Sequence, residues 1–214
     1  MIPWLLLDTA RIPGGGEFSI MLGDNELMNS RLGGSEEALA TLACERIRAR
    51  PGARVLIGGL GMGFTLRAAL GALDEGAQVD VAELVPAVVA WARGPMAEVF
   101  GSSLTDPRVK IVEADVGRVI RAGRGVYDAI LLDVDNGPDG LARAANDGLY
   151  DMRGLRAAHA ALRPGGVLSV WSSGPDRAFA GRLGEAGFSV EEVKARAKGG
   201  GGARHVIWVA TRGG

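Results

Sequence analysis

The stretch VLIGGLGMGFTLRAAL, from Val55 to Leu70, decides the fold that this chain is expected to adopt. An apolar run that favours a β-strand leads into a glycine-rich turn, and a segment with helical spacing of apolar residues follows. A second apolar run, VDVAE, ends in Glu83, twenty residues after Gly63. A strand, a glycine turn, a helix and a second strand ending in a carboxylate are the arrangement by which parallel α/β sheets bind a nucleoside.

Short β-rich runs continue to alternate with helix-length segments along the chain. Strands are expected at 54–57, 78–83, 109–113, 127–133 and 166–172. Helices are expected at 35–50, 63–73, 86–100, 148–162 and 176–186, the first of them starting at Ser35, Glu36 and Glu37. This alternation is typical of βαβ crossovers, so the fold class expected is α/β with a Rossmann-like, doubly wound, mostly parallel sheet.

The two ends of the chain follow other patterns. The runs GFSVEEVKAR and ARHVIWVATR flank glycines 199–202, which predicts a hairpin of two antiparallel strands. Ahead of Ser35, the runs at 4–12 and 17–28 predict two or three short strands in a small N-terminal β-hairpin layer. We therefore expect an N-terminal β-strand extension over residues 1–34 and an α/β domain over residues 35–214.

Composition narrows the classes of partner. A formal net charge of -1 over 214 residues provides no global field toward nucleic acid or a membrane. The single cysteine, Cys44, cannot form an internal disulfide or a cysteine metal cage, which favours a cytoplasmic protein. The two histidines, His159 and His205, are too few for a zinc site or a triad, and each is expected on a helix face or an edge strand.

The spacing of the glycines distinguishes between cofactors. Gly59, Gly61 and Gly63 give G-x-G-x-G, whereas the dinucleotide fingerprint requires a third glycine at the position of Phe64. No G-x-x-x-x-G-K-[ST] motif occurs, so both NAD and a P-loop nucleotide are disfavoured. Glycines let the backbone pass close to a ligand, and a turn of purely structural use is the alternative.

Three carboxylates follow the ends of successive expected strands. Glu83 can accept hydrogen bonds from two ribose hydroxyls. Asp115 either caps the following helix or receives the exocyclic amine of adenine, and the two roles are compatible. Asp133, with Asp135 close behind it, lies where reactive groups gather in open α/β sheets, outside the carboxyl ends of the strands.

These motifs, in this order, resemble the class I S-adenosylmethionine-dependent methyltransferases and, more narrowly, their spermidine synthase-like branch. The resemblance rests on the GGxGxG turn, Glu83, Asp115, DAILLDVDNGP and LRPGGVLSV. It implies a seven-stranded sheet with one reversed strand within 203–210, and S-adenosyl-L-methionine or its decarboxylated form lying across the glycine turn. It also implies that Glu83 holds the ribose, Asp115 the adenine amine, and that Asp133 faces the sulfonium and the acceptor.

The chain departs from spermidine synthases in the acceptor half of the pattern. Of the D-[ST]-[ST]-D-P motif, Asp133 matches the first acid, but Asn136 occupies the position of the second. Of the D-E-x-x-Y-x-E motif, SEEALAT keeps Glu36 but has Leu39 for the tyrosine and Thr41 for the final acid. The cofactor half of the pattern is therefore more complete than the acceptor half.

The expected activity is group transfer from a sulfonium, with methyl transfer to a small, possibly cationic acceptor as the main interpretation. Asp133 or Asp135 is placed to remove a proton from a protonated amine. An excess of aspartates over 133–151 suits a cationic acceptor, and a solvated loop with aspartates at turns explains it equally. Aminopropyl transfer from decarboxylated S-adenosylmethionine and a non-catalytic cofactor-binding module are the alternatives.

Two further expectations concern metals and assembly. Metal-dependent O-methyltransferases carry an Asp-Asn pair after the fifth strand, where this chain has Trp171, Ser172 and Ser173, so no metal is expected. Pairing of the N-terminal strands between two copies would give a homodimer, which the sequence alone does not establish.

Overall fold

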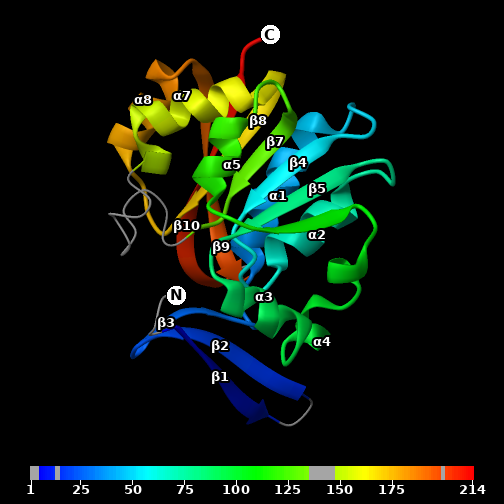
Figure 1. The fold of residues 1–214 in the computed structure, drawn as a ribbon. Coiled ribbons are helices and arrows are strands. Elements are labelled where there is room, and N and C mark those ends of the chain that lie inside the picture. The colour runs from blue at the N-terminus through cyan, green and yellow to red at the C-terminus, as the bar shows by residue number, and fades with distance from the viewer. Residues whose placement is uncertain (1–4, 13–14, 135–147, 199–200) are drawn as a thin grey trace.

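The computed structural model describes residues 5–12, 15–134, 148–198 and 201–214, and it contains two β-sheets. The smaller sheet is antiparallel and has the order β1-β2-β3, with β1 at Leu5–Ile12, β2 at Gly15–Leu22 and β3 at Asn25–Asn29. The predicted N-terminal strand layer is thereby confirmed. Figure 1 shows it below the larger sheet, on the side where the parallel strands end.

The larger sheet has seven strands in the order β6-β5-β4-β7-β8-β10-β9. Their bounds are Arg54–Gly58 for β4, Gln78–Glu83 for β5, Val109–Glu113 for β6, Tyr127–Leu132 for β7, Leu162–Ser172 for β8, Phe188–Lys198 for β9 and Gly201–Arg212 for β10. Strands β6, β5, β4, β7 and β8 pair in parallel, whereas β10 is antiparallel to both β8 and β9. The expected seven-stranded sheet with one reversed strand near 203–210 is confirmed.

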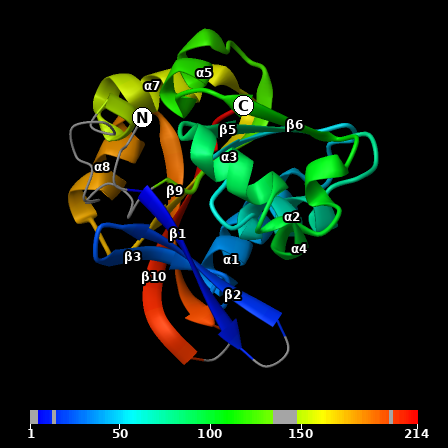
Figure 2. The same ribbon diagram turned by 60° about the horizontal axis from the view of Figure 1, so that its bottom comes forward.

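Helices cover both faces of the larger sheet, as Figure 2 shows. One apolar cluster joins the sheet to α1 (Gly34–Ile47), α2 (Phe64–Ala72), α3 (Pro86–Arg93) and α4 (Ala97–Phe100). A second cluster joins the opposite face to α5 (Val116–Ala122), α7 (Met152–Ala161) and α8 (Arg177–Glu185), and a short 3-10 helix spans Ser103–Thr105. The sheet is doubly wound, as predicted.

The sequence of β4 shows why helices cover both faces of the sheet. Val55 and Ile57 belong to the first apolar cluster and Leu56 to the second, and all three side chains are fully buried. A parallel strand buried on both faces reads as a continuous apolar run because neither face meets water. The strand order reverses at β4, with β5 and β6 on one side and β7 and β8 on the other. Ligands of open α/β sheets bind in the crevice at such a reversal.

The helix expected over 86–100 is wrong, because the structure contains two helices there. Helix α3 ends at Arg93 and α4 begins at Ala97, with Gly94 and Pro95 between them. Proline lacks the backbone N–H of a helical hydrogen bond, and its ring clashes with the preceding turn. The chain therefore turns before α4 instead of continuing the first helix.

Two helix starts also differ from the expected ones. Helix α1 begins at Gly34 with Gly33 at its N-cap position, so that Ser35 lies inside the first turn and is buried. Helix α7 begins only at Met152, where the Asp151 side chain accepts the N–H of Gly154, and Leu162 already belongs to β8. No helix within the described ranges is long and apolar enough to cross a membrane.

Candidate functional site

The glycine turn between β4 and α2 has left-handed backbone at all three positions named by the motif. The φ angles are +91° at Gly59, +48° at Gly61 and +72° at Gly63. A Cβ on Gly59 would lie 2.3 Å from the carbonyl oxygen of Asp133, and one on Gly63 would lie 2.4 Å from the Phe100 ring. Packing within the protein thus requires these glycines, so the glycine pattern by itself does not demand a ligand.

Glu83 ties the glycine turn to the end of β5. Its side chain is buried, with Oε2 accepting the N–H of Leu60 at 2.9 Å and Oε1 accepting the N–H of Val85 at 2.7 Å. These two bonds hold the carboxylate at the carboxyl end of β5, next to the glycine turn, and contact with the ribose hydroxyls stays a prediction. The next residue, Leu84, is a large apolar side chain that is 54% exposed beside the end of β5.

Asp115 caps helix α5. Its Oδ1 accepts the N–H of Arg118 at 2.7 Å and lies 3.5 Å from Nη2 of Arg121. The capping role predicted from the sequence is confirmed. Contact with the adenine amine stays a prediction, compatible with this geometry because the side chain is partly exposed.

Asp133 lies directly after β7 and its side chain is partly buried. Its backbone N–H donates to the carbonyl of Gly58 at 3.0 Å, and Thr65 Oγ1 lies 2.5 Å from Asp133 Oδ2. Burial, followed by the negative charge of Glu36, raises the pKa of Asp133 to about 7, against the opposing hydrogen bond from Thr65. A carboxyl with a pKa near neutrality can both accept and release a proton under physiological conditions. Asp135 and most of the aspartates over 133–151 lie outside the described residues.

A polar cluster that the sequence did not predict forms at the first turn of α1. The hydroxyl of Ser35 donates to Glu36 Oε2 at 2.6 Å, and Nδ1 of His205 lies 2.8 Å from the same hydroxyl oxygen. The rings of Trp171 and His205 meet edge to face, with centroids 4.7 Å apart. Burial lowers the pKa of His205, and the charge of Glu36 opposes that shift.

His205 was expected on a helix face or an edge strand, and this expectation is wrong. It lies on β10, which β8 and β9 flank on its two sides. Only the placement of β10 brings its side chain to the start of α1, since His205 and Ser35 are 170 residues apart. No motif in the sequence marks this contact, nor that of Thr65 with Asp133.

The N-terminal sheet reaches the glycine turn through Met28 of β3. A Cβ on Gly61 would lie 2.8 Å from the sulfur of Met28. Beside it, the buried Asn29 accepts the N–H groups of Arg31 and Leu32, which shapes the turn toward α1. The small sheet therefore closes one side of the crevice at the carboxyl ends of the strands.

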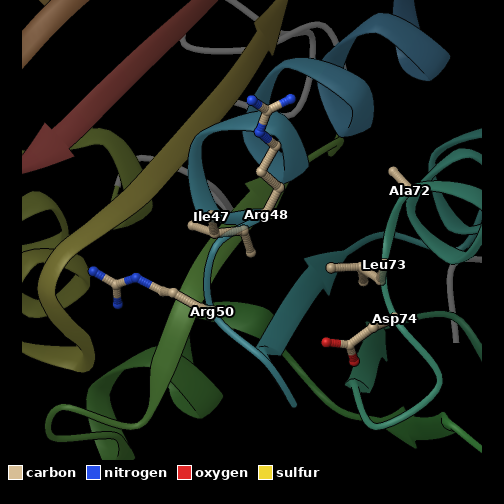
Figure 3. Close-up of a pocket in the computed structure, with 6 residues that line it drawn as sticks. All are labelled: Ile47, Arg48, Arg50, Ala72, Leu73 and Asp74. Carbon is tan, nitrogen blue, oxygen red and sulfur yellow. The ribbon is translucent and has the colours of Figure 1, made fainter.

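A surface pocket at the other end of the molecule is not part of this site. It has a volume of about 290 Å³ and lies where α1 and α2 end, lined by Ile47, Arg48, Arg50, Ala72, Leu73 and Asp74. In Figure 3 the Arg50 side chain extends away from Asp74, and its guanidinium donates to Asp128 at 2.8 Å. Among the described residues, no group of three or more histidine, cysteine or acidic side chains could hold a metal ion.

Sequence comparison finds one informative relative, and no family model matches the chain. Polyamine aminopropyltransferase 1 of Streptomyces coelicolor is 36% identical over 128 residues, which cover 58% of this chain and 23% of that protein. The chain thus spans less than a quarter of the length of this curated relative.

Comparison with solved structures gives longer matches. A spermidine synthase in complex with the transition-state analogue AdoDATO has a TM-score of 0.78 at 20% identity, over 98% of this chain and 71% of that chain. Spermidine synthase from Thermotoga maritima gives 0.74 at 20% identity, over 98% and 69%. A putative O-methyltransferase from Klebsiella pneumoniae gives 0.60 at 18% identity, over 84% and 80%.

The strand order, the reversed β10 and these matches define the class. The chain has the fold of the class I S-adenosylmethionine-dependent methyltransferases. Within that class it is similar to the spermidine synthase-like branch, and the matches to the two spermidine synthases extend over 98% of the chain. The resemblance inferred from the motifs is confirmed.

Proposed function

We propose that this protein transfers an aminopropyl group from decarboxylated S-adenosylmethionine to a small amine. The observation that carries the proposal is the partly buried carboxyl of Asp133, held by Thr65, beside the charge of Glu36 at the carboxyl end of β7. Two acids at one point of a crevice attract an ammonium group and repel a carboxylate. Aminopropyl transfer therefore replaces methyl transfer as the main interpretation, in agreement with the named activity of the Streptomyces coelicolor relative.

The cofactor half of the proposed site is built around the glycine turn. Its backbone would lie along the nucleoside, and Glu83 would accept hydrogen bonds from the ribose hydroxyls. The exposed side chain of Leu84 supplies apolar surface for a face of the base, and Asp115 would accept from the adenine amine. The N-terminal β-strand extension of residues 1–34 would cover the bound molecule through Met28.

The acceptor half supplies a base and a counter-charge. When bound, the sulfonium nucleoside supplies the aminopropyl carbon, and its sulfur takes the electron pair of the broken C–S bond to become a neutral thioether. Asp133 would accept one proton from the acceptor ammonium, which frees the nitrogen lone pair to form the new C–N bond. Most of the remaining rate enhancement would come from holding the two reactants in line.

Methyl transfer from intact S-adenosylmethionine is the second candidate. The fold shared with the putative O-methyltransferase favours it. Against it, Glu36, Glu83 and Asp133 give this region acidic groups, which would repel the methionine carboxylate that only the intact cofactor carries.

Ligand-induced stabilisation and product analysis together test the proposal. The unfolding temperature is measured with S-adenosylmethionine, its decarboxylated form and methylthioadenosine, because a ligand of the folded state raises stability according to its affinity. Larger stabilisation by the decarboxylated form, with methylthioadenosine released in the presence of an aliphatic diamine, supports aminopropyl transfer. Preference for the intact form with a methylated product would overturn it, and binding without transfer would indicate a non-catalytic module.

The predicted homodimer stays a prediction. Leu6 of β1 is 58% exposed and Leu27 of β3 is 37% exposed, so both outer strands of the small sheet carry apolar surface. Sedimentation velocity of the chain and of a Leu6→Asp variant would check it.

A further inference from the structure

The hydrogen-bond chain at the start of α1 has a defined direction. Ser35 has one hydroxyl hydrogen, and the ionised carboxylate of Glu36 at 2.6 Å can only accept. The hydroxyl oxygen of Ser35 must therefore accept from Nδ1–H of His205 at 2.8 Å. This assigns the neutral imidazole as the tautomer protonated at Nδ1, and the edge-to-face contact with Trp171 holds the ring in that orientation.

The hydrogen-bond chain ends at the Glu36 carboxylate, whose negative charge acts on Asp133. The negative charge of Glu36 raises the pKa of Asp133. The two residues are also joined through Thr65, whose Oγ1 lies 2.5 Å from Asp133 Oδ2 and 3.4 Å from the backbone oxygen of Glu36. The neighbouring Glu37 instead interacts with Arg67 of α2 and is exposed. Glu36 is thus the acid of this helix turn that faces the site.

The groups that surround Asp133 and Glu36 come from four elements. Asp133 follows β7, Glu36 belongs to α1 and His205 to β10. Thr65 of α2 and Trp171 of β8 contact the same groups and carry no charge.

We propose that His205 and Ser35 are positioning residues that hold the Glu36 carboxylate beside Asp133, so that these two acids together receive the cationic nitrogen of the acceptor. Glu36 then supplies a second negative charge beside Asp133. Because Oε2 of Glu36 is fixed by Ser35, the remaining lone pairs of the carboxylate are available to an ammonium group. The proposal rests on the proposed function for the identity of the ligand, but the positioning itself is a property of the free protein.

The test measures the pKa of Asp133 in the ligand-free protein by carboxyl carbon NMR, with Asp133→Asn to assign the resonance. A matched pair of variants separates the effect of the His205 hydrogen bond from the effect of its aromatic ring. His205→Phe keeps an aromatic ring against Trp171 but removes the donor, whereas His205→Asn keeps an N–H donor near the position of Nδ1. Ser35→Ala removes the hydroxyl, and Glu36→Gln removes the charge.

Release of Glu36 removes negative potential from Asp133, so its pKa should fall. We expect a decrease of about one pH unit in His205→Phe and Ser35→Ala, and a value near that of the wild type in His205→Asn. In the Glu36→Gln background, His205→Phe should cause no further decrease, because the effect acts through Glu36. An unchanged or increased pKa in His205→Phe and Ser35→Ala, with folding verified by circular dichroism, would overturn the proposal.

Kinetics with an amine acceptor provide the second readout. In His205→Phe we expect KM for the amine to rise about tenfold with little change in cofactor affinity. In His205→Asn we expect KM for the amine to stay near the wild-type value. Equal losses in both variants would contradict a positioning role for the donor. If no amine is a substrate but the pKa of Asp133 still falls in His205→Phe, the proposed function fails and the positioning of Glu36 stands.

Discussion

Thr65 Oγ1 lies 2.5 Å from Asp133 Oδ2, which joins the first turn of α2 to the end of β7 in a partly buried site. The hydroxyl stabilises the charged form of Asp133, while burial and Glu36 stabilise the neutral form. When Asp133 is protonated, it can donate to Thr65, and the Thr65 hydroxyl can then turn toward the backbone oxygen of Glu36. The hydrogen bond between Thr65 and Asp133 can therefore form whether Asp133 is ionised or protonated, and the backbone does not have to move.

Replacing Asp133 by asparagine should abolish turnover and leave cofactor binding nearly intact. The amide keeps the shape of the carboxyl but cannot accept a proton from the acceptor. Initial rates with an amine acceptor and ligand-induced stabilisation by the decarboxylated cofactor check the two halves of this expectation. Weakened cofactor binding together with retained turnover would contradict the role assigned to Asp133.

The pH dependence of stability should show the raised pKa of Asp133. With a folded pKa of about 7 and an ordinary value of 3.8, the folded state binds this proton more tightly than the unfolded chain between those values. The resulting stability is fully present below 3.8 and is lost as the pH rises to about 7.

Urea unfolding of wild type and Asp133→Asn over that range measures this contribution, because the other ionisable groups cancel in the difference. We expect the variant to gain stability relative to the wild type as the pH rises, and the difference to level off above neutrality. A difference that stays constant with pH would show that Asp133 has an ordinary pKa.

Gly59→Ala should destabilise the protein and disrupt the cofactor turn. The new Cβ would lie 2.3 Å from the Asp133 carbonyl oxygen on a backbone with φ of +91°, and backbone atoms cannot move aside as a flexible side chain can. We expect a loss of about 2–4 kcal/mol in the free energy of unfolding.

Gly71→Ala is the matched control for that substitution. Gly71 lies near the end of α2, is exposed, and a Cβ there would meet no atom within 4 Å. Because alanine favours helix more than glycine does, the variant should gain about 0.5–1 kcal/mol. Chemical denaturation of both variants compares the two outcomes directly, and similar destabilisation of both would contradict the packing argument.

Asp128→Asn should lower stability without changing cofactor affinity. The Asp128 carboxylate is buried and accepts from Arg50 at 2.8 Å, from Arg163 at 2.7 Å and from the backbone N–H of Arg54 at 2.9 Å. We expect a loss of about 2–3 kcal/mol, because charged donors lose their buried partner.

Arg46→Ala is the surface comparison for Asp128→Asn. It removes the ion pair between Arg46 and Glu191, both of which are exposed, and should change the free energy of unfolding by less than about 0.5 kcal/mol. Thermal and urea unfolding measure both variants. A comparable loss of stability in the two variants would show that burial of Asp128 does not explain how much its ion pairs stabilise the protein.

Leu84→Ala should weaken cofactor binding about tenfold with little effect on stability. The side chain is 54% exposed in the free protein, so its truncation removes little apolar contact. A bound base would cover it, and covering such a side chain contributes about 1.5 kcal/mol or more. Isothermal titration with methylthioadenosine checks the affinity. An unchanged affinity would place the base elsewhere.

Much of the fold could be predicted because it follows from local patterns. Continuous apolar runs such as 54–57 predict strands buried on both faces, and their alternation with helix-length segments predicts a parallel, doubly wound sheet. The break at Pro95 was also present in the sequence, although the expectation of one helix over 86–100 overlooked it. The start of β8 at Leu162 could not be predicted from the sequence, because pairing with β7 extends that strand through Pro164 and the glycines that follow it.

The candidate site could be predicted only as far as it follows from strand ends. Glu83, Asp115 and Asp133 each follow a strand of the parallel sheet, so their common edge is implied by the topology. The capping of α5 by Asp115 is equally local, because the acceptor and donor are three residues apart. Asp135 is a predicted site residue that lies outside the described residues.

The sequence by itself determined the glycine turn, the order of carboxylates behind it and the class of fold, since these depend on periodicity and spacing within short segments. Only the tertiary structure decided which acid acts with Asp133. His205 meets Ser35 across 170 residues because β10 inserts between β8 and β9, and Thr65 meets Asp133 because the first turn of α2 reaches the residue that follows β7. Burial then raises the pKa of Asp133 to about 7, which depends on the surrounding packing and not on its neighbours in sequence.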